Sequence, residues 1–216
     1  MKNALIVGST GLIGGYLLEE LKEKKLFKIV YVLSRRKLND LDSAFENIVV
    51  DFETLNSVEI PEKIDVVFCA LGTTIKKAGS KPAFEKVDYE YVINSAELGK
   101  KFGATCFSLV SAIGADENST FFYNRVKGKT ENKLKSLGYE RLQIVRPSLL
   151  GGERKEFRFG EKIAQLLSPL FSIFLIGKLK KYRMVHGRKV AQTMLSLYKD
   201  NALNHCIIES DKINEV

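Results

Sequence analysis

A tyrosine and a lysine stand four residues apart, at Tyr123 and Lys127, in the run Tyr-Asn-Arg-Val-Lys. Side chains at this spacing share one face of a helix, so we expect the phenol and the ammonium to meet. A phenol keeps its proton up to about pH 10, and a neighbouring ammonium makes the phenolate easier to form. Such a pair suits a reductase, because the alkoxide formed when a carbonyl accepts a hydride must be protonated. Lys127 can also donate to the ribose hydroxyls of a nicotinamide cofactor.

A serine precedes this pair by twelve residues. Ser111 ends the strand-like run at 105–111, where its hydroxyl can hold a substrate oxygen beside the phenol. Ser108, three residues earlier, is a less favoured alternative for this role. The predicted catalytic residues are therefore Ser111, Tyr123 and Lys127.

A glycine-rich turn comes directly after the first strand-like run of the chain. Within it, Gly8 permits a tight turn, Gly11 lets a pyrophosphate approach the backbone, and Gly14 allows close packing of helix on strand. The helix that begins here offers free N–H groups and the positive end of its dipole. The turn is predicted to bind a dinucleotide through seven consecutive residues: Gly8, Ser9, Thr10, Gly11, Leu12, Ile13 and Gly14.

The second strand-like run ends in Ser34, Arg35 and Arg36, without the carboxylate that an NAD-preferring site usually offers to the ribose. Guanidinium groups pair well with a 2′-phosphate through charge-assisted hydrogen bonds. The sequence therefore favours NADP(H) over NAD(H). The alternative is that the two arginines belong to a basic turn in solvent and do not contact a cofactor. No metal site is predicted.

Other residues are placed around the cofactor by the order of the strands. Asp51 and Phe52 come after the third strand, where adenine is commonly contacted, although Asp51 suits the capping of a turn equally well. Further residues are expected at the carboxyl ends of later strands, namely Leu71, Gly72, Thr73 and Pro147. His186 has no partner that the sequence identifies, and we expect it to be a structural or surface residue and not a catalytic one.

Strand-like runs alternate with helix-like stretches, which predicts a doubly wound parallel sheet of the Rossmann type covered on both faces. We expect one NAD(P)-binding domain over 1–216, with 152–204 as a small helical substrate-cleft or lid extension. The apolar stretch 163–177 has fifteen uncharged residues, fewer than the roughly twenty that span a membrane. It is interpreted as a cover for the substrate cleft, with a membrane-surface or dimer contact as the alternative. The predicted strands are 4–8, 28–33, 47–52, 65–72, 105–111, 141–147 and 205–210, and the predicted helices are 12–25, 84–102, 124–137 and 188–199.

Composition narrows the classes of function. The 216 residues are 45% hydrophobic and 28% charged, as in ordinary globular proteins, with a net charge of +8. The lysines are dispersed, which favours a basic surface with an anionic ligand over nucleic-acid binding. Three scattered cysteines indicate neither a disulfide framework nor a zinc site. The N-terminus lacks a secretory apolar region, so we expect a cytoplasmic location.

Several runs of residues are more distinctive than the glycine turn. On them the chain resembles the atypical short-chain dehydrogenases, and within these the oxidoreductase family named for the HIV Tat-interacting protein (CC3), over 2–198. That resemblance implies NADPH binding and a Ser111, Tyr123, Lys127 site. The chain departs from the family in having Ser111-Ala112-Ile113 where two serines and a lysine are expected. The runs are Leu71-Gly72-Thr73-Thr74, Lys77-Ala78-Gly79, Val87-Asp88-Tyr89, Ser95-Ala96-Glu97-Leu98, Gly114-Ala115-Asp116, Tyr123 to Gly128 and Arg146-Pro147.

These observations leave three hypotheses about function, of which nucleic-acid binding through the positive charge is the least favoured. The first is an NADP(H)-dependent reductase of a carbonyl in a small or lipid-like molecule. The second is a regulatory protein that senses NADP(H) and signals to a protein partner without turnover. The tyrosine and lysine favour the first, because a sensor has no need of them.

Overall fold

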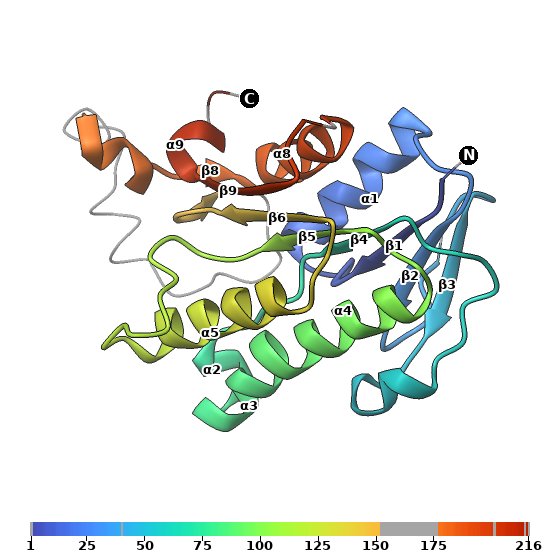
Figure 1. The fold of residues 1–216 in the computed structure, drawn as a ribbon, viewed down its shortest axis with the longest axis horizontal. Coiled ribbons are helices and arrows are strands. Elements are labelled where there is room, and N and C mark those ends of the chain that lie inside the picture. The colour runs from blue at the N-terminus through green and yellow to red at the C-terminus, as the bar shows by residue number, and fades with distance from the viewer. Residues whose placement is uncertain (1, 40, 152–176, 201, 214, 216) are drawn as a thin grey trace.

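The computed structural model describes residues 2–39, 41–151, 177–200, 202–213 and 215. Seven strands form one sheet in the order β3-β2-β1-β4-β5-β6-β9, and every neighbouring pair is parallel (Figure 1). The strands are β1 (Ala4–Val7), β2 (Val30–Ser34), β3 (Phe45–Val49), β4 (Val66–Cys69), β5 (Cys106–Val110), β6 (Arg141–Arg146) and β9 (His205–Glu209).

Helices cover both faces of the sheet (Figure 1). On one face lie α1 (Leu12–Lys24) and α8 (Gly187–Lys199), and on the other lie the 3₁₀ helix η1 (Phe52–Ser57), α4 (Tyr91–Lys101) and α5 (Phe122–Ser136). Each face has its own apolar core. The doubly wound Rossmann architecture predicted from the sequence is thus confirmed.

The central strands are almost entirely apolar because both of their faces are covered, and the polar exceptions are the buried Ser34 in β2 and Ser108 in β5. Every residue of β1, β2, β4 and β5 is buried. A strand buried on both sides cannot alternate apolar with polar residues, which is why these segments read as continuous apolar runs.

One long helical segment differs from the predicted helix 84–102. It begins earlier, with α3 (Lys81–Glu85), passes through the π-helical turn η2 (Lys86–Glu90) and continues as α4. The side chain of Ser80 caps α3 by accepting the N–H of Ala83 at 3.2 Å. Pro82 is tolerated because the first turn of a helix has unpaired N–H groups. A shorter helix, α2 (Ile75–Ala78), precedes this segment.

The C-terminal part completes the layers. α8 packs beside α1, and β9 adds the edge strand next to β6. The remaining elements are β7 (Leu150–Gly151), paired with β8 (Val185–His186), the 3₁₀ helix η3 (Gly177–Tyr182) and α9 (Ser210–Ile213).

The predicted lid role of 152–204 remains a prediction. Its residues 152–176, with most of the apolar stretch, lie outside the described residues. Among the residues that are described, no helix is long and apolar enough to cross a membrane.

Candidate nucleotide-binding and active site

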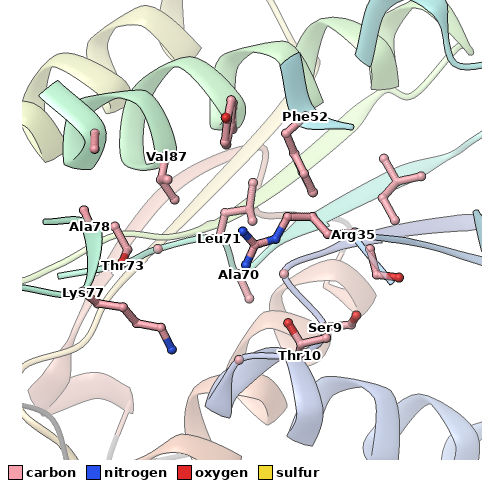
Figure 2. A pocket seen from close by; sticks show the side chains of 17 residues that line it. Ser9, Thr10, Arg35, Phe52, Ala70, Leu71, Thr73, Lys77, Ala78 and Val87 are labelled. Carbon is pink, nitrogen blue, oxygen red and sulfur yellow. The ribbon is translucent and has the colours of Figure 1, made fainter. Parts of the chain in front are cut away.

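A cavity of 430 Å³ lies at the carboxyl ends of β1, β2 and β4, where open α/β sheets bind ligands (Figure 2). Its volume falls in the range of small-molecule sites. It is lined by seventeen residues: Gly8, Ser9, Thr10, Gly11, Leu33, Ser34, Arg35, Phe52, Ala70, Leu71, Gly72, Thr73, Lys77, Ala78, Ala83, Val87 and Tyr91.

The glycine turn has the geometry of a phosphate cradle. Gly8 has a φ of +89°, and a Cβ there would lie 2.6 Å from the backbone of Ala70. A Cβ at Gly14 would lie 2.2 Å from the carbonyl oxygen of Gly8, so helix α1 packs directly on the turn. Gly11 begins that helix without a side-chain cap, which leaves the N–H groups of the first turn for a ligand. The turn therefore fits a pyrophosphate.

The seven predicted residues of the turn divide into two groups. Those at positions 8–11 line the cavity. Leu12, Ile13 and Gly14 form the start of α1 instead, and Ile13 and Gly14 are buried. Ser9 lines the cavity, and its hydroxyl is buried without a hydrogen-bond partner among the described residues.

The end of β2 is shaped by a hydroxyl that the protein itself uses. Ser34 donates to the carbonyl of Arg36 at 2.6 Å and accepts from the side chain of Asn47 at 2.9 Å. These bonds fix the turn, and Arg35 extends across the cavity toward Leu71 (Figure 2). Arg36 is exposed and does not line the cavity. Of the two predicted arginines, only Arg35 reaches the site.

An aromatic wall closes another side of the cavity. The rings of Phe52 and Tyr91 lie 5.3 Å apart, and the hydroxyl of Tyr91 donates to Glu53 at 2.5 Å. Asp51 does not line the cavity; its carboxylate accepts the N–H of Glu53 at 3.0 Å and caps η1, the alternative that the sequence left open. Phe52 thus reaches the cavity whereas Asp51 holds the turn.

Two lining residues with functional side chains were missed by the sequence reasoning. Lys77 on α2 points into the cavity (Figure 2), and Tyr91, which stacks beside Phe52, also lines it. Lys77 belongs to one of the distinctive runs, the one that comes after the fourth strand, but a lysine in a mixed segment gives no sign of its direction. The cavity therefore contains two cations, Arg35 and Lys77, and no carboxylate among its described lining residues.

Tyr123 and Lys127 lie on α5, as predicted, and Lys127 is buried. Its ammonium forms an ion pair with Asp88 Oδ1 at 2.8 Å, and the other oxygen of Asp88 accepts the N–H of Thr73 at 2.8 Å. Burial by itself lowers the pKa of Lys127, but Asp88 and Tyr123 outweigh it, so the pKa lies above its ordinary value. Lys127 and Asp88 are not among the residues that line the cavity, but both approach it at Gly72, where a Cβ would lie 3.4 Å from Asp88 Oδ1 and 3.8 Å from Lys127 Nζ.

Ser111 is placed differently from Tyr123 and Lys127. Its hydroxyl donates to Glu131 at 2.5 Å, and Glu131 forms two further hydrogen bonds with Arg146, at 3.0 and 2.6 Å. Glu131 lies eight residues after Tyr123, about two helical turns along α5. In the part of the chain that the structure describes, the Ser111 hydroxyl is therefore bound to Glu131 and not to Tyr123. Pro147 is buried near this network and does not line the cavity; its carbonyl accepts the N–H of Ile113 at 3.0 Å.

Comparison with known proteins places this geometry in a family. A family model described as "Semialdehyde dehydrogenase, NAD binding domain" matches residues 3–99. Protein HTATIP2 of Rattus norvegicus is 42% identical over 76% of this chain and 69% of its own length. Protein FMP52, mitochondrial, of Eremothecium gossypii is 36% identical over 98% of this chain and 95% of its own. The chain belongs to the HTATIP2/FMP52 family of NAD(P)-binding atypical short-chain dehydrogenases.

Solved structures share the fold of this HTATIP2/FMP52-family chain. MoeE5 in complex with UDP-glucose and NAD has a TM-score of 0.71 at 14% identity, over 98% of this chain and 79% of that one. UDP-glucose 4-epimerase of Thermotoga maritima has a TM-score of 0.66 at 20% identity, over 98% and 79%. At such low identity the similarity establishes the fold alone.

The expectation of a cytoplasmic location is wrong. FMP52 proteins of Eremothecium gossypii, Debaryomyces hansenii and Candida albicans are named as mitochondrial. The expectation rested on the N-terminal residues alone, and these do not distinguish the cytoplasm from an organelle.

Proposed function

We propose that this family member is an NADP(H)-dependent oxidoreductase that reduces the carbonyl of a small or lipid-like molecule. The observation that carries the proposal is the position of the Tyr123 and Lys127 helix. The Lys127 ammonium lies directly behind Gly72, at the wall of a cavity built on the glycine turn. This proximity supports the assignment of Tyr123 and Lys127 to the nicotinamide end of the cavity.

The choice of NADP(H) over NAD(H) rests on charge. Arg35 and Lys77 both face the cavity, and its described lining carries no carboxylate to accept the hydroxyls of an adenosine ribose. A guanidinium binds a phosphate through paired hydrogen bonds. Arg35 therefore contacts the 2′-phosphate in this proposal, while the turn at 8–11 holds the pyrophosphate.

The contacts of each side chain define its role. A bound nicotinamide supplies the hydride. Tyr123 holds the proton that the product oxygen needs, and Lys127 orients the ribose and favours release of that proton. A hydroxyl donates one hydrogen bond at a time, and that of Ser111 donates to Glu131. Ser111 therefore keeps its predicted role as donor to the substrate oxygen only if its hydroxyl turns away from Glu131.

The bond from Ser111 to Glu131 favours a second candidate function. A protein that binds NADP(H) as a sensor, and passes the signal to a protein partner without turnover, has no need of a free serine hydroxyl. Replacement of Tyr123 by Phe separates the two functions. A reductase should keep NADPH binding but lose turnover by about a hundredfold or more, since proton transfer contributes at least that much. A sensor should lose neither binding nor signalling.

A titration of the purified protein with NADPH and NADH, followed by fluorescence, tests the cofactor site. We expect NADPH to bind more tightly, and Arg35→Ala to reduce its affinity to near that of NADH. Arg36→Ala is the matched control, because Arg36 is adjacent but does not line the cavity. Equal effects of the two substitutions, or no binding of either nucleotide, would contradict the proposal.

The location of this activity is proposed from the relatives. Because the FMP52 proteins are named as mitochondrial, we propose that the chain acts in or on mitochondria. Fractionation of cells that express a tagged full chain would check this, with a cytosolic pool as the contrary result.

A further inference from the structure

Asp88 binds Lys127 but has no role in the chemistry proposed above. We infer that Asp88 is a positioning residue, whose carboxylate holds the Lys127 ammonium charged and directed at the nicotinamide half of the cofactor cavity. The inference rests on the proposed function, in which Lys127 serves the nicotinamide ribose. It adds a residue from a different helical segment to the pair on α5.

The contacts of Asp88 join the two parts of the site. One oxygen contacts Lys127 Nζ at 2.8 Å, and the other accepts the N–H of Thr73, a residue of the cavity wall, at 2.8 Å. The hydroxyl of Thr130 on α5 lies 2.9 Å from the Asp88 carbonyl and 2.9 Å from the Val126 carbonyl, and the proton that these two oxygens share links the backbone of η2 to that helix. Asp88 thus connects the cavity loop with the face of α5 that carries Lys127.

Burial makes this ion pair unlike the others in the described part of the chain. Asp88 has no exposed surface and Lys127 has 4%. A buried ion pair is weak evidence for stability, because apolar residues of similar volume often serve as well. Its position at the cavity wall, behind Gly72, instead indicates a role in the site.

The local backbone supports the same interpretation. Asp88 is the central residue of the π-helical turn η2, set into an otherwise continuous helical segment from α3 to α4. A π turn inserts one residue into the helix and rotates the next residues about its axis, and such turns occur frequently at functional sites. Here the turn brings a carboxylate to the buried lysine.

The groups that face Lys127 determine its charge. They are Asp88 on η2, Tyr123 on its own helix and the buried Cys69 at the end of β4. Burial lowers the pKa of Lys127, and Asp88 is the largest opposing influence. Without Asp88 the buried amine should release its proton much more readily.

The first test measures the charge of Lys127 directly. Protein carrying lysine labelled with ¹³C at Cε is titrated by NMR, and the Lys127 signal is assigned by its loss in Lys127→Arg. In Asp88→Asn we expect the pKa of Lys127 to fall by about 2 pH units or more. The matched control is Glu85→Gln, which should leave the pKa of Lys127 unchanged. Glu85 pairs with the exposed Lys129 at 2.7 Å, and neither residue lines the cavity. An unchanged Lys127 titration in Asp88→Asn would overturn the inference.

The second test separates positioning from a structural role. NADPH is compared with 2′,5′-ADP, which lacks the nicotinamide half. Asp88→Asn should weaken NADPH about tenfold, the value of one charge-assisted hydrogen bond, and leave 2′,5′-ADP unchanged. Equal weakening of both ligands, or of neither, overturns the inference.

Asp88→Glu keeps the negative charge and displaces the carboxylate. This variant replaces Asp88→Asn in the binding comparison if Asp88→Asn does not fold. It should also weaken NADPH selectively, and an unchanged affinity for NADPH would contradict the inference. If the wild-type protein binds no nucleotide, the proposed function fails, whereas the Lys127 titration still decides whether Asp88 holds the charge.

Discussion

Two cations reach the cavity from different elements, Arg35 from the end of β2 and Lys77 from α2 (Figure 2). They stand beside different parts of the proposed cofactor. Arg35 and Phe52 form the side of the cavity that the proposal assigns to adenosine, whereas Lys77 extends toward the glycine turn (Figure 2). We therefore expect Arg35 to select the 2′-phosphate and Lys77 to contact the pyrophosphate, which NADPH and NADH share.

Lys77→Ala should weaken NADPH, NADH and ADP-ribose by a similar factor, about tenfold, because each loses the same charge-assisted contact. Isothermal titration calorimetry of the three ligands measures this. Lys76→Ala is the matched control, since Lys76 is on the same short helix but does not line the cavity. A loss confined to NADPH would place Lys77 at the 2′-phosphate instead.

At the scale of elements, a buried carboxylate joins α1 to α8. Glu20 on α1 is 2% exposed and accepts from Arg188 at 3.1 Å and Gln192 at 2.8 Å, both on α8, and from Lys24 on its own helix. Burial by itself raises the pKa of Glu20, but the hydrogen bonds from Lys24, Gln192 and Arg188 outweigh it. The pKa therefore lies below the ordinary value of 4.5.

Glu20→Gln should lower the free energy of unfolding by about 2 kcal/mol in urea denaturation at pH 7, a value reduced because Lys24 and Arg188 are partly in solvent. A carboxyl group whose pKa is lower in the folded than in the unfolded state stabilises the folded state at pH values above the unfolded-state pKa. This stabilisation is lost as the pH falls through the folded-state pKa. The difference between wild type and variant should thus shrink below about pH 4.5. Glu19→Gln alters an exposed neighbour that pairs with Arg188, and this substitution should lower the free energy of unfolding much less.

At the scale of the whole molecule, nucleotide binding and folding are linked. The cavity is built from loops at the ends of β1, β2 and β4, and the unfolded chain has no such arrangement. A ligand that binds only the folded state stabilises it by about 2.7 kcal/mol at a hundred times its Kd. For a chain of this size we expect NADPH to raise Tm by roughly 5–10 °C, as measured by differential scanning calorimetry. Arg35→Ala should reduce that rise at the same NADPH concentration, and an unchanged Tm of the wild type would contradict the proposed cofactor.

The sequence by itself determined the layers of the molecule and the place of the cofactor turn. Local patterns suffice for this, because apolar runs report strands buried on both faces and glycines report the turn whose backbone a Cβ would block. The pairing of Tyr123 with Lys127 on one helix is likewise a matter of spacing.

Only the tertiary structure decided which side chains face the cavity and which bind one another. It distinguished Arg35 from Arg36 and Phe52 from Asp51, and it directed the Ser111 hydroxyl to Glu131. It also brought Asp88 to Lys127, 39 positions along the chain. Such contacts join residues that are distant in sequence, and their geometry depends on how helices pack on the sheet, which no local pattern records.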